Sequence, residues 1–339
     1  DIDDNLIFVQ REIDAPDKPD AWAVSTKKQA LPPELRNVLE ETESVAFLVI
    51  KDDTIRAEEY WDKYGPDSKS NSFSMAKSIV STLIGIAIKD GYIKSIEQPV
   101  ANFLPEFKEG DKKFITIKHL LMMSSGLNWD ESYGNPLSVT TEGYYGDNLK
   151  KAISKLEAVE KPGQEFSYKS GDTQVLAFVL EAATGKKLSD FASERFWKRV
   201  GAAHDAEWSI DHENGDEKAF CCFFSNARDF ARLGKLYLQN GVWNGDTLLP
   251  ASYVKAATTP HGLPYGSGKQ SDFYGYQWWI IPEFNGHKVF YARGILGQYM
   301  VAVPDKNLII VRLGKNKKEK VNNHYKDMLE ITEQVLKNY

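Results

Sequence analysis

The 339-residue sequence has few cysteines and no metal-binding pattern of histidines. Its two cysteines, Cys221 and Cys222, are adjacent, and neighbouring cysteines rarely pair. We therefore expect no structural disulfide, and we interpret both residues as small apolar side chains. The six histidines lack ligand spacings such as His-x-x-x-His, so we predict no metal and no other cofactor.

Long apolar and long basic runs are also missing. No segment reaches the roughly 20 apolar residues that a transmembrane helix needs, so we expect none. The basic tract at 315–320 is short and interrupted, and the net charge is −6, so no nucleic-acid partner is expected. The start, Asp1–Asp4, is no signal peptide but resembles what a cleaved leader leaves behind.

The composition, with 42% hydrophobic and 27% charged residues, is typical of a globular protein. Strand patterns lie near both ends of the chain. A hairpin is predicted over Val45–Trp61, and further strands at 274–281, 288–292, 298–303 and 308–313. Helices are predicted at 33–42, from Ser74 to Gly91, and at 324–337.

Between these ends, residues 99–220 are rich in helix and loop patterns. The sequence therefore predicts an α/β (α+β) fold, in which one antiparallel sheet is built from both termini and flanked by helices. We expect residues 1–98 and 221–339 to form this sheet domain. Residues 99–220 would form an inserted, mainly helical domain.

The most informative motif is Ser74-Met75-Ala76-Lys77, a Ser-x-x-Lys at the first turn of a helix that is apolar almost all round. Residues three apart share a helix face, so the hydroxyl and the amine can touch. A buried lysine loses affinity for its proton and can activate a serine hydroxyl. The alternative is that Ser74 caps the helix and Lys77 extends to solvent.

Two further segments carry possible chemistry. Tyr168 follows a loop that begins at Pro162-Gly163, and a phenol beside a lysine can pass a proton to a leaving group. The alternative for Tyr168 is packing. The glycines of Gly294-Ile295-Leu296-Gly297 permit close backbone approach, so an N–H there could bind an oxyanion. The alternative for this segment is a plain β-bulge.

Aromatic, glycine-containing stretches follow Ser124-Ser125-Gly126-Leu127. They contain Tyr133 and Tyr145, which are candidates for a lid that shapes the substrate pocket. Ordinary surface packing is the alternative.

Together, these motifs resemble the class C β-lactamase-like family, the penicillin-binding-like serine hydrolases. The resemblance runs from about Val45 to Leu313, and the order and spacing of its segments make it specific. Those segments are 73–78, 115–127, 162–170, 226–234, 240–245 and 274–279.

This resemblance implies roles for individual residues. Ser74 would be the acylated nucleophile, Lys77 its base and Tyr168 the proton relay to the leaving group. The backbone N–H groups of Ser74 and Ile295 would form the oxyanion hole. No cofactor is implied, and many such proteins are exported, so the resemblance suggests a periplasmic protein, or one that is lipid-anchored before trimming.

Two departures separate the sequence from β-lactamases. Ser170 replaces the Asn of the Tyr-x-Asn motif, so an amide that contacts the substrate is lost. Ala292-Arg293-Gly294 replaces Lys-Thr-Gly, so the usual cation is missing. Arg293 is adjacent, but strand neighbours point to opposite faces. Ser170, Arg293 and Gly294, which stand at or beside these two motif positions, are nevertheless candidate substrate-binding residues, as are Tyr133 and Tyr145.

The resulting prediction is a serine hydrolase that acts through an acyl-enzyme on a small ester or amide. This pattern is closest to the esterase and 6-aminohexanoate-dimer hydrolase branch. A β-lactamase or D-amino-acid carboxypeptidase-like enzyme is the second hypothesis. A non-catalytic scaffold with the same fold is the third. The physiological substrate and the oligomeric state stay open.

Overall fold

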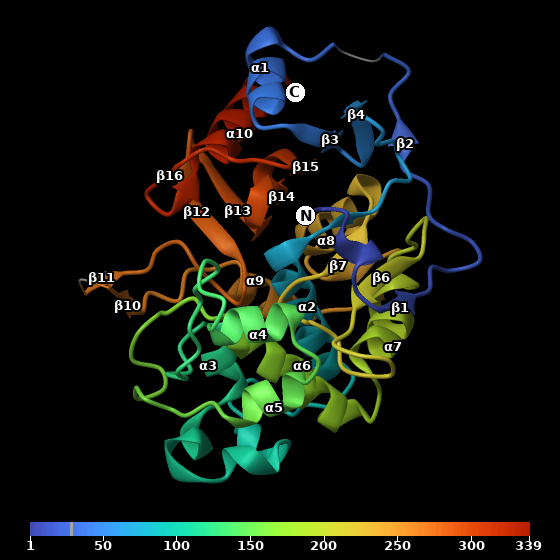
Figure 1. Cartoon of the computed structure of the whole chain (residues 1–339). Helices are drawn as coiled ribbons and strands as arrows, with labels where there is room; N and C mark the ends of the chain where they lie inside the picture. The colour runs from blue at the N-terminus through green and yellow to red at the C-terminus, as the bar shows by residue number, and fades with distance from the viewer. Residues whose placement is uncertain (28–29, 267) are drawn as a thin grey trace.

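A computed structural model describes residues 1–27, 30–266 and 268–339 of the chain (Figure 1). Its main sheet has seven strands contributed by both ends of the sequence, as predicted. In spatial order they are β12 (Trp279–Phe284), β13 (His287–Gly294), β14 (Gln298–Val303), β15 (Leu308–Gly314), β3 (Ser44–Lys51), β4 (Thr54–Tyr60) and β2 (Ala23–Val24).

The pairing in this sheet is antiparallel from β12 to β4, but the short strand β2 pairs with β4 in parallel. The sheet is therefore mixed, which corrects the prediction of a purely antiparallel one. The predicted hairpin is confirmed as β3 and β4, with Val49 opposite Ala57.

Both faces of the sheet are covered, because alternate side chains of its central strands enter two separate cores. Phe47 and Val49 pack with the terminal helices α1 (Pro33–Glu41) and α10 (Lys326–Asn338). Leu48 and Ile50 face the larger core, and α8 (Ala227–Leu238) packs on that side against β14 and β15. Figure 1 shows α1 and α10 together at one end of the molecule.

The centre of the larger core is α2 (Ala76–Lys89), which runs directly on from a 3-10 turn at Phe73–Met75. Every residue of α2 from Ala76 to Ala87 is buried, as the all-round apolar pattern predicts. Gly91, with φ +83°, follows its end. The helix beginning at Ser74 is thus confirmed, except that its first turn is a 3-10 turn.

The remaining helices gather around α2. Five of them lie between residues 117 and 192, at the end of the molecule opposite α1 and α10 (Figure 1). They are α3 (Ile117–Leu121), α4 (Val139–Tyr145), α5 (Leu149–Ser154), α6 (Ser170–Thr184) and α7 (Leu188–Ala192), while α9 (Ala251–Ala257) comes later in the chain. The division into domains at 99 and 220 stays a prediction.

A second sheet, of four strands, was not expected from the sequence. In spatial order it comprises β1 (Gln10–Ile13), β6 (Ala206–Ser209), β7 (Phe223–Ser225) and β5 (Ser70–Asn71). Its strands are too short to show a clear period, so only their pairing across the chain defines them. This sheet matters for function because β5 leads into Ser74 and β7 follows the two cysteines.

Three two-stranded hairpins complete the described structure. They are β8 (Val242–Trp243) with β9 (Asp246–Thr247), β10 (Pro264–Tyr265) with β11 (Lys269–Gln270), and β16 (Lys320–Val321) with β17 (His324–Tyr325). In the described parts of the chain, every helix is too short or too polar to cross a bilayer.

The strand predicted over 274–281 is wrong in its first half. β12 begins only at Trp279, and Gln277 has a left-handed φ of +60°. The backbone reverses here, so that Tyr274 bridges to Trp279. The reason lies in α2, where Ser78 and Ser81 donate hydrogen bonds to the carbonyls of Gln277 and Tyr276 and hold them out of any ladder.

Candidate active site

Ser74 and Lys77 meet at the start of α2, as the motif predicts. The Lys77 Nζ donates a hydrogen bond of 2.9 Å to the Ser74 Oγ. A second bond, of 2.8 Å, goes to the backbone carbonyl of Phe220. The alternative in which Lys77 extends to solvent is wrong, because the residue is only 1% exposed.

Burial decides the protonation of Lys77. Loss of hydration lowers its pKa from 10.5 to about 8, and the negative charge of Glu131 acts weakly in the opposite direction. An amine with such a pKa is partly neutral near physiological pH. It can therefore accept a proton from the hydroxyl that it contacts.

Tyr168 lies beside this pair. Lys77 Nζ is 5.1 Å from the centre of the Tyr168 ring, which packs edge-on against Tyr274 and tilted against Trp279. Burial raises the pKa of the phenol well above its usual range, Glu131 adds to this effect, and a side-chain hydrogen bond with Ser74 opposes it. The phenol therefore stays protonated and can donate.

The segment that carries Tyr168 is fixed by its backbone. The Ser167 N–H donates to the Met123 carbonyl at 2.8 Å, and the Gly163 N–H donates to the Ser124 carbonyl at 2.8 Å. Gly163 has φ +77°, and a Cβ there would come within 2.8 Å of the His119 ring. The Pro-Gly loop thus places the tyrosine at the entrance to α6.

The segments that carry the predicted oxyanion donors lie close together, because β13 ends against the residues just before Ser74. A Cβ added to Gly294 would lie 2.2 Å from the Ser72 carbonyl oxygen, so only glycine permits this approach. Ile295 follows immediately and lines the same cleft as Ser74. The oxyanion role of the two N–H groups stays a prediction.

A cleft opens at Ser74 and has two parts. Ser74, Tyr133 and Ile295 line both parts. The first part, about 220 Å³, is also lined by Glu131, Tyr168, Trp279, Arg293, Gly294, Lys320 and Tyr325. The second part, about 200 Å³, is also lined by Asp1, Phe73, Thr140, Thr141, Tyr144, Tyr145, Ser170, Phe220, Cys221 and Leu296.

All the candidate substrate-binding residues therefore border this cleft. Tyr133 and Tyr145 are 56% and 71% exposed, which places them at its rim. Glu131, Trp279 and Tyr325 were not predicted as site residues from the sequence. They come from three distant segments, and only the fold brings them together.

Ser170, which replaces the Asn of the Tyr-x-Asn motif, binds Glu131. The Glu131 carboxylate accepts two hydrogen bonds of 2.6 Å, from the Ser170 N–H and from the Ser170 hydroxyl. Tyr133 also donates to it. A carboxylate at the start of α6 is favoured by the helix dipole. The donors of Ser170 are thus directed at Glu131.

The expectation that the Arg293 side chain points to the face opposite the missing cation is wrong. Side chains do alternate along β13, but Ala292 enters the larger core whereas Arg293 lines the cleft. The Arg293 guanidinium stacks 3.3 Å from the centre of the Trp279 ring and donates to the Asn323 carbonyl. The pocket therefore has a cation next to the usual place.

The expectation of two unpaired cysteines is also wrong, since Cys221 and Cys222 form a disulfide. Cys222 adopts a left-handed φ of +65°, a conformation that the spacing argument did not consider. The bond lies close to the site, because Phe220, which accepts from Lys77, immediately precedes it.

Comparisons with known proteins agree with this fold. A family model described as Beta-lactamase matches residues 35–331. The 6-aminohexanoate-dimer hydrolase of Paenarthrobacter ureafaciens is 28% identical over 301 residues, which span 83% of this chain and 75% of that protein. A Bacillus anthracis structure described as a candidate 6-aminohexanoate-dimer hydrolase aligns with a TM-score of 0.85 and 22% identity, covering 99% of this chain and 92% of that one.

A family VIII carboxylesterase shares the fold at greater distance, with a TM-score of 0.69 and 15% identity over 91% of this chain and 99% of that one. The fold and the relatives define an enzyme of the serine hydrolase type. The chain belongs to the beta-lactamase family. The predicted family and the β-lactamase/transpeptidase-like fold are thereby confirmed.

Proposed function

We propose that the protein hydrolyses a small ester or amide through an acyl-enzyme on Ser74. The observation that carries this proposal is the hydrogen bond between the buried Lys77 amine and the Ser74 hydroxyl, at the floor of a cleft. Relatives named as a 6-aminohexanoate-dimer hydrolase and a carboxylesterase support this substrate class. No cofactor is needed for the reaction.

In the acylation step, Ser74 Oγ attacks the carbonyl carbon while its proton passes to neutral Lys77. The N–H groups of Ser74 and Ile295 would stabilise the negative oxygen. Tyr168 donates a proton to the departing alcohol or amine, and the ammonium of Lys77 restores the phenol. Water then attacks the acyl carbon and gives a proton to the neutral Lys77 amine. The bond from the acyl carbon to Ser74 Oγ breaks, Lys77 returns the proton to Ser74 Oγ, and the carboxylic acid leaves.

Labelling with an organophosphonate tests this proposal. The expected result is one covalent adduct per chain, mapped to Ser74, together with a burst of product from a short-chain p-nitrophenyl ester. Failure of a broad ester, amide and lactam panel, with no adduct, would instead favour a non-catalytic scaffold.

The pH dependence follows from the lowered pKa of Lys77. Only the neutral amine accepts a proton, so kcat/KM for an uncharged ester should rise about tenfold per pH unit below the pKa and level off above about 8. Initial rates at constant ionic strength check this expectation. A profile that is flat between about pH 6 and 9 would exclude Lys77 as the base.

The first part of the cleft favours a substrate with a negatively charged group. Arg293, Lys317 and Lys320 surround the Tyr325 ring at 4.9, 5.3 and 5.4 Å. In the described part of the chain, none of the three forms an ion pair with an acidic side chain. A carboxylate on the substrate would relieve their repulsion.

Arg293→Gln should therefore weaken turnover of carboxylate-bearing esters by roughly tenfold to a hundredfold in kcat/KM, because a charge-assisted hydrogen bond is lost. A matched neutral ester should change by less than about threefold. The two substrates are compared with the same enzyme preparation. Equal losses for both esters would argue against an anion-binding role.

The position of Arg293 in the cleft also supports a second candidate function, a β-lactamase or D-amino-acid carboxypeptidase-like activity. Substrates of these reactions carry a carboxylate near the bond that is cut. Fast turnover of a chromogenic cephalosporin would favour this candidate. Turnover of p-nitrophenyl esters alone would favour the first.

A further inference from the structure

The turn Phe220–Phe223, here called the cysteine turn, contacts Lys77 on one side and the residues just before Ser74 on the other. On one side, the Phe220 carbonyl accepts a hydrogen bond of 2.8 Å from the Lys77 amine. The Phe220 ring centre is also 5.8 Å from that amine. The cysteine turn therefore provides the backbone acceptor that holds Lys77 toward Ser74.

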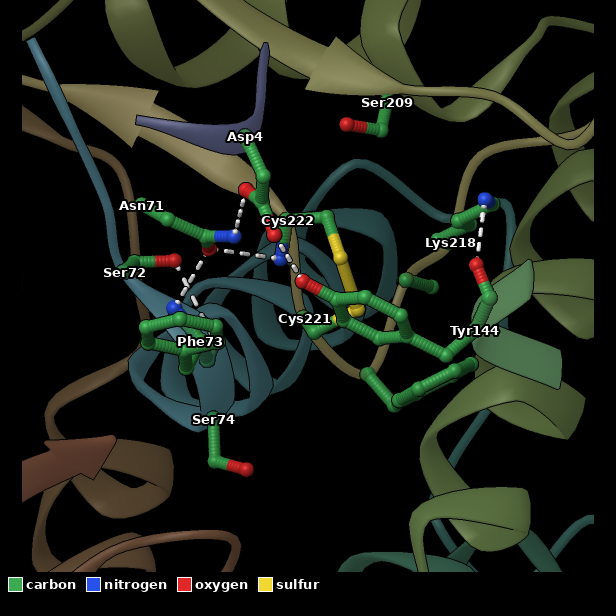
Figure 2. The surroundings of a disulfide bond; sticks show 12 residues. Asp4, Asn71, Ser72, Phe73, Ser74, Tyr144, Ser209, Lys218, Cys221 and Cys222 are labelled. Atoms are coloured by element: carbon green, nitrogen blue, oxygen red, sulfur yellow. Dashed lines mark hydrogen bonds between the residues drawn. A yellow bond between two sulfur atoms is a disulfide. The ribbon is translucent and has the colours of Figure 1, made fainter. Parts of the chain in front are cut away.

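On the other side, the cysteine turn is tied to the residues just before Ser74 (Figure 2). The Asn71 Oδ1 accepts from the N–H groups of Cys222, at 3.2 Å, and of Phe73, at 2.8 Å. The Ser72 N–H donates to the Phe223 carbonyl at 2.8 Å. A shift of the cysteine turn would thus displace both the Ser74 hydroxyl and the Lys77 amine.

The Cys221–Cys222 bond closes a small ring within the cysteine turn and limits its backbone freedom. Cys222 has φ +65°, which non-glycine residues seldom adopt without a constraint. Both cysteines are buried, at 4% and 0% exposure, yet Cys221 borders the second part of the cleft. A small reductant that enters this part of the cleft would therefore meet Cys221.

We propose that the Cys221–Cys222 disulfide is a positioning element for the Ser74–Lys77 pair, and that its reduction by a small dithiol slows acylation. This inference rests on the proposed function. In the reduction step the S–S bond breaks, and each sulfur gains one electron and one proton. The dithiol loses two electrons and two protons and becomes a disulfide, so the step is balanced and reversible.

The first measurement counts thiols. Because the chain has two cysteines, the untreated protein should take up no alkylating reagent when unfolded, and the reduced protein should take up two equivalents by intact mass. Two adducts on untreated protein, prepared under air and without reductant, would overturn the proposal.

The second measurement compares acylation rates in the oxidised, reduced and Cys221→Ser/Cys222→Ser forms. Rates are taken from phosphonate labelling of Ser74 and from turnover of a p-nitrophenyl ester. A small displacement of catalytic groups lowers rates by roughly tenfold to a hundredfold, so we expect that loss in the reduced and double-variant forms. Reoxidation should restore the rate of the reduced wild type. The double variant should not respond to the dithiol, which controls for other effects of the reagent.

A pH profile separates positioning from a general loss of structure. Among the described residues, the titratable side chains that act on Lys77 are Glu131, from the loop before α4, through its charge, and Tyr168, from the segment before α6, whose ring centre is 5.1 Å from the amine. Neither belongs to the cysteine turn, so loosening that turn leaves both in place and lets water reach the amine. The rising limb of the profile should then move to higher pH in the reduced enzyme.

Equal rates and equal profiles in the oxidised and reduced enzymes would overturn the proposal while leaving the proposed function intact. Absence of turnover and labelling in the oxidised enzyme would instead overturn the proposed function, and this inference with it. Near-ultraviolet circular dichroism verifies that the reduced protein is folded when it is assayed. A fold lost on reduction would likewise contradict a positioning role.

Discussion

Ser74→Ala should abolish phosphonate labelling and lower ester turnover by on the order of 10⁴-fold or more, as removal of a catalytic nucleophile does in other serine hydrolases. The substitution removes the oxygen that accepts the Lys77 hydrogen bond but leaves the buried amine and the Phe220 carbonyl in contact. The variant should therefore fold. Labelling by intact mass and initial rates with a p-nitrophenyl ester provide the measurement.

Ser252→Ala is a matched control for this prediction. Ser252 and Lys255 have the same Ser-x-x-Lys spacing, but they lie on α9, away from the Ser74 cleft, and both border a different cavity. The control should keep wild-type labelling and turnover. Loss of activity in the control, or retention of it in Ser74→Ala, would contradict the assignment of the nucleophile.

Lys77→Met should lower acylation by roughly 10³-fold or more, because among the described residues no other amine forms a hydrogen bond with the serine hydroxyl. Its effect on stability should be small at pH 7. Lowering the pKa of Lys77 from 10.5 to about 8 corresponds to a burial penalty of about 3 kcal/mol, which the substitution removes. The Phe220 carbonyl meanwhile loses its donor, at a cost of about 1–3 kcal/mol.

The lowered pKa of Lys77 also determines how the stability of the wild type changes with pH. Between about pH 8 and 10.5 the unfolded lysine holds a proton that the folded one has released, so the wild type gains stability as pH rises through this range. Relative to Lys77→Met, the wild type should gain up to about 3 kcal/mol of unfolding free energy. Urea unfolding of both proteins at several pH values measures this difference. A constant difference would indicate an unshifted lysine.

The sequence predicted the parts of the fold that depend on local pattern. The β3–β4 hairpin and the apolar helix after Ser74 are continuous elements whose period is visible in one segment. The second sheet was missed because its strands have two to four residues and are defined by partners up to about 200 positions away. The false start of β12 at Tyr274 arose from side-chain hydrogen bonds that no strand pattern records.

The candidate site was predicted where a motif has fixed spacing. Ser74 and Lys77 are one turn apart, so helical geometry alone brings them together. Glu131, Trp279 and Tyr325 join them only through tertiary packing, which a single sequence does not reveal. Side chains alternate along β13 as expected, but Arg293 faces the cleft and Ala292 faces the core, which is the reverse of the prediction.

Ser74 lines both parts of the cleft, so each part can contact a different half of the substrate. A bond cut at this junction would have one half among Arg293, Trp279 and Tyr325, and the other among Thr141, Tyr144 and Tyr145. These two sets come from separate stretches of the chain. Evolution or engineering could therefore retune preference for one end of a molecule while leaving recognition of the other end unchanged.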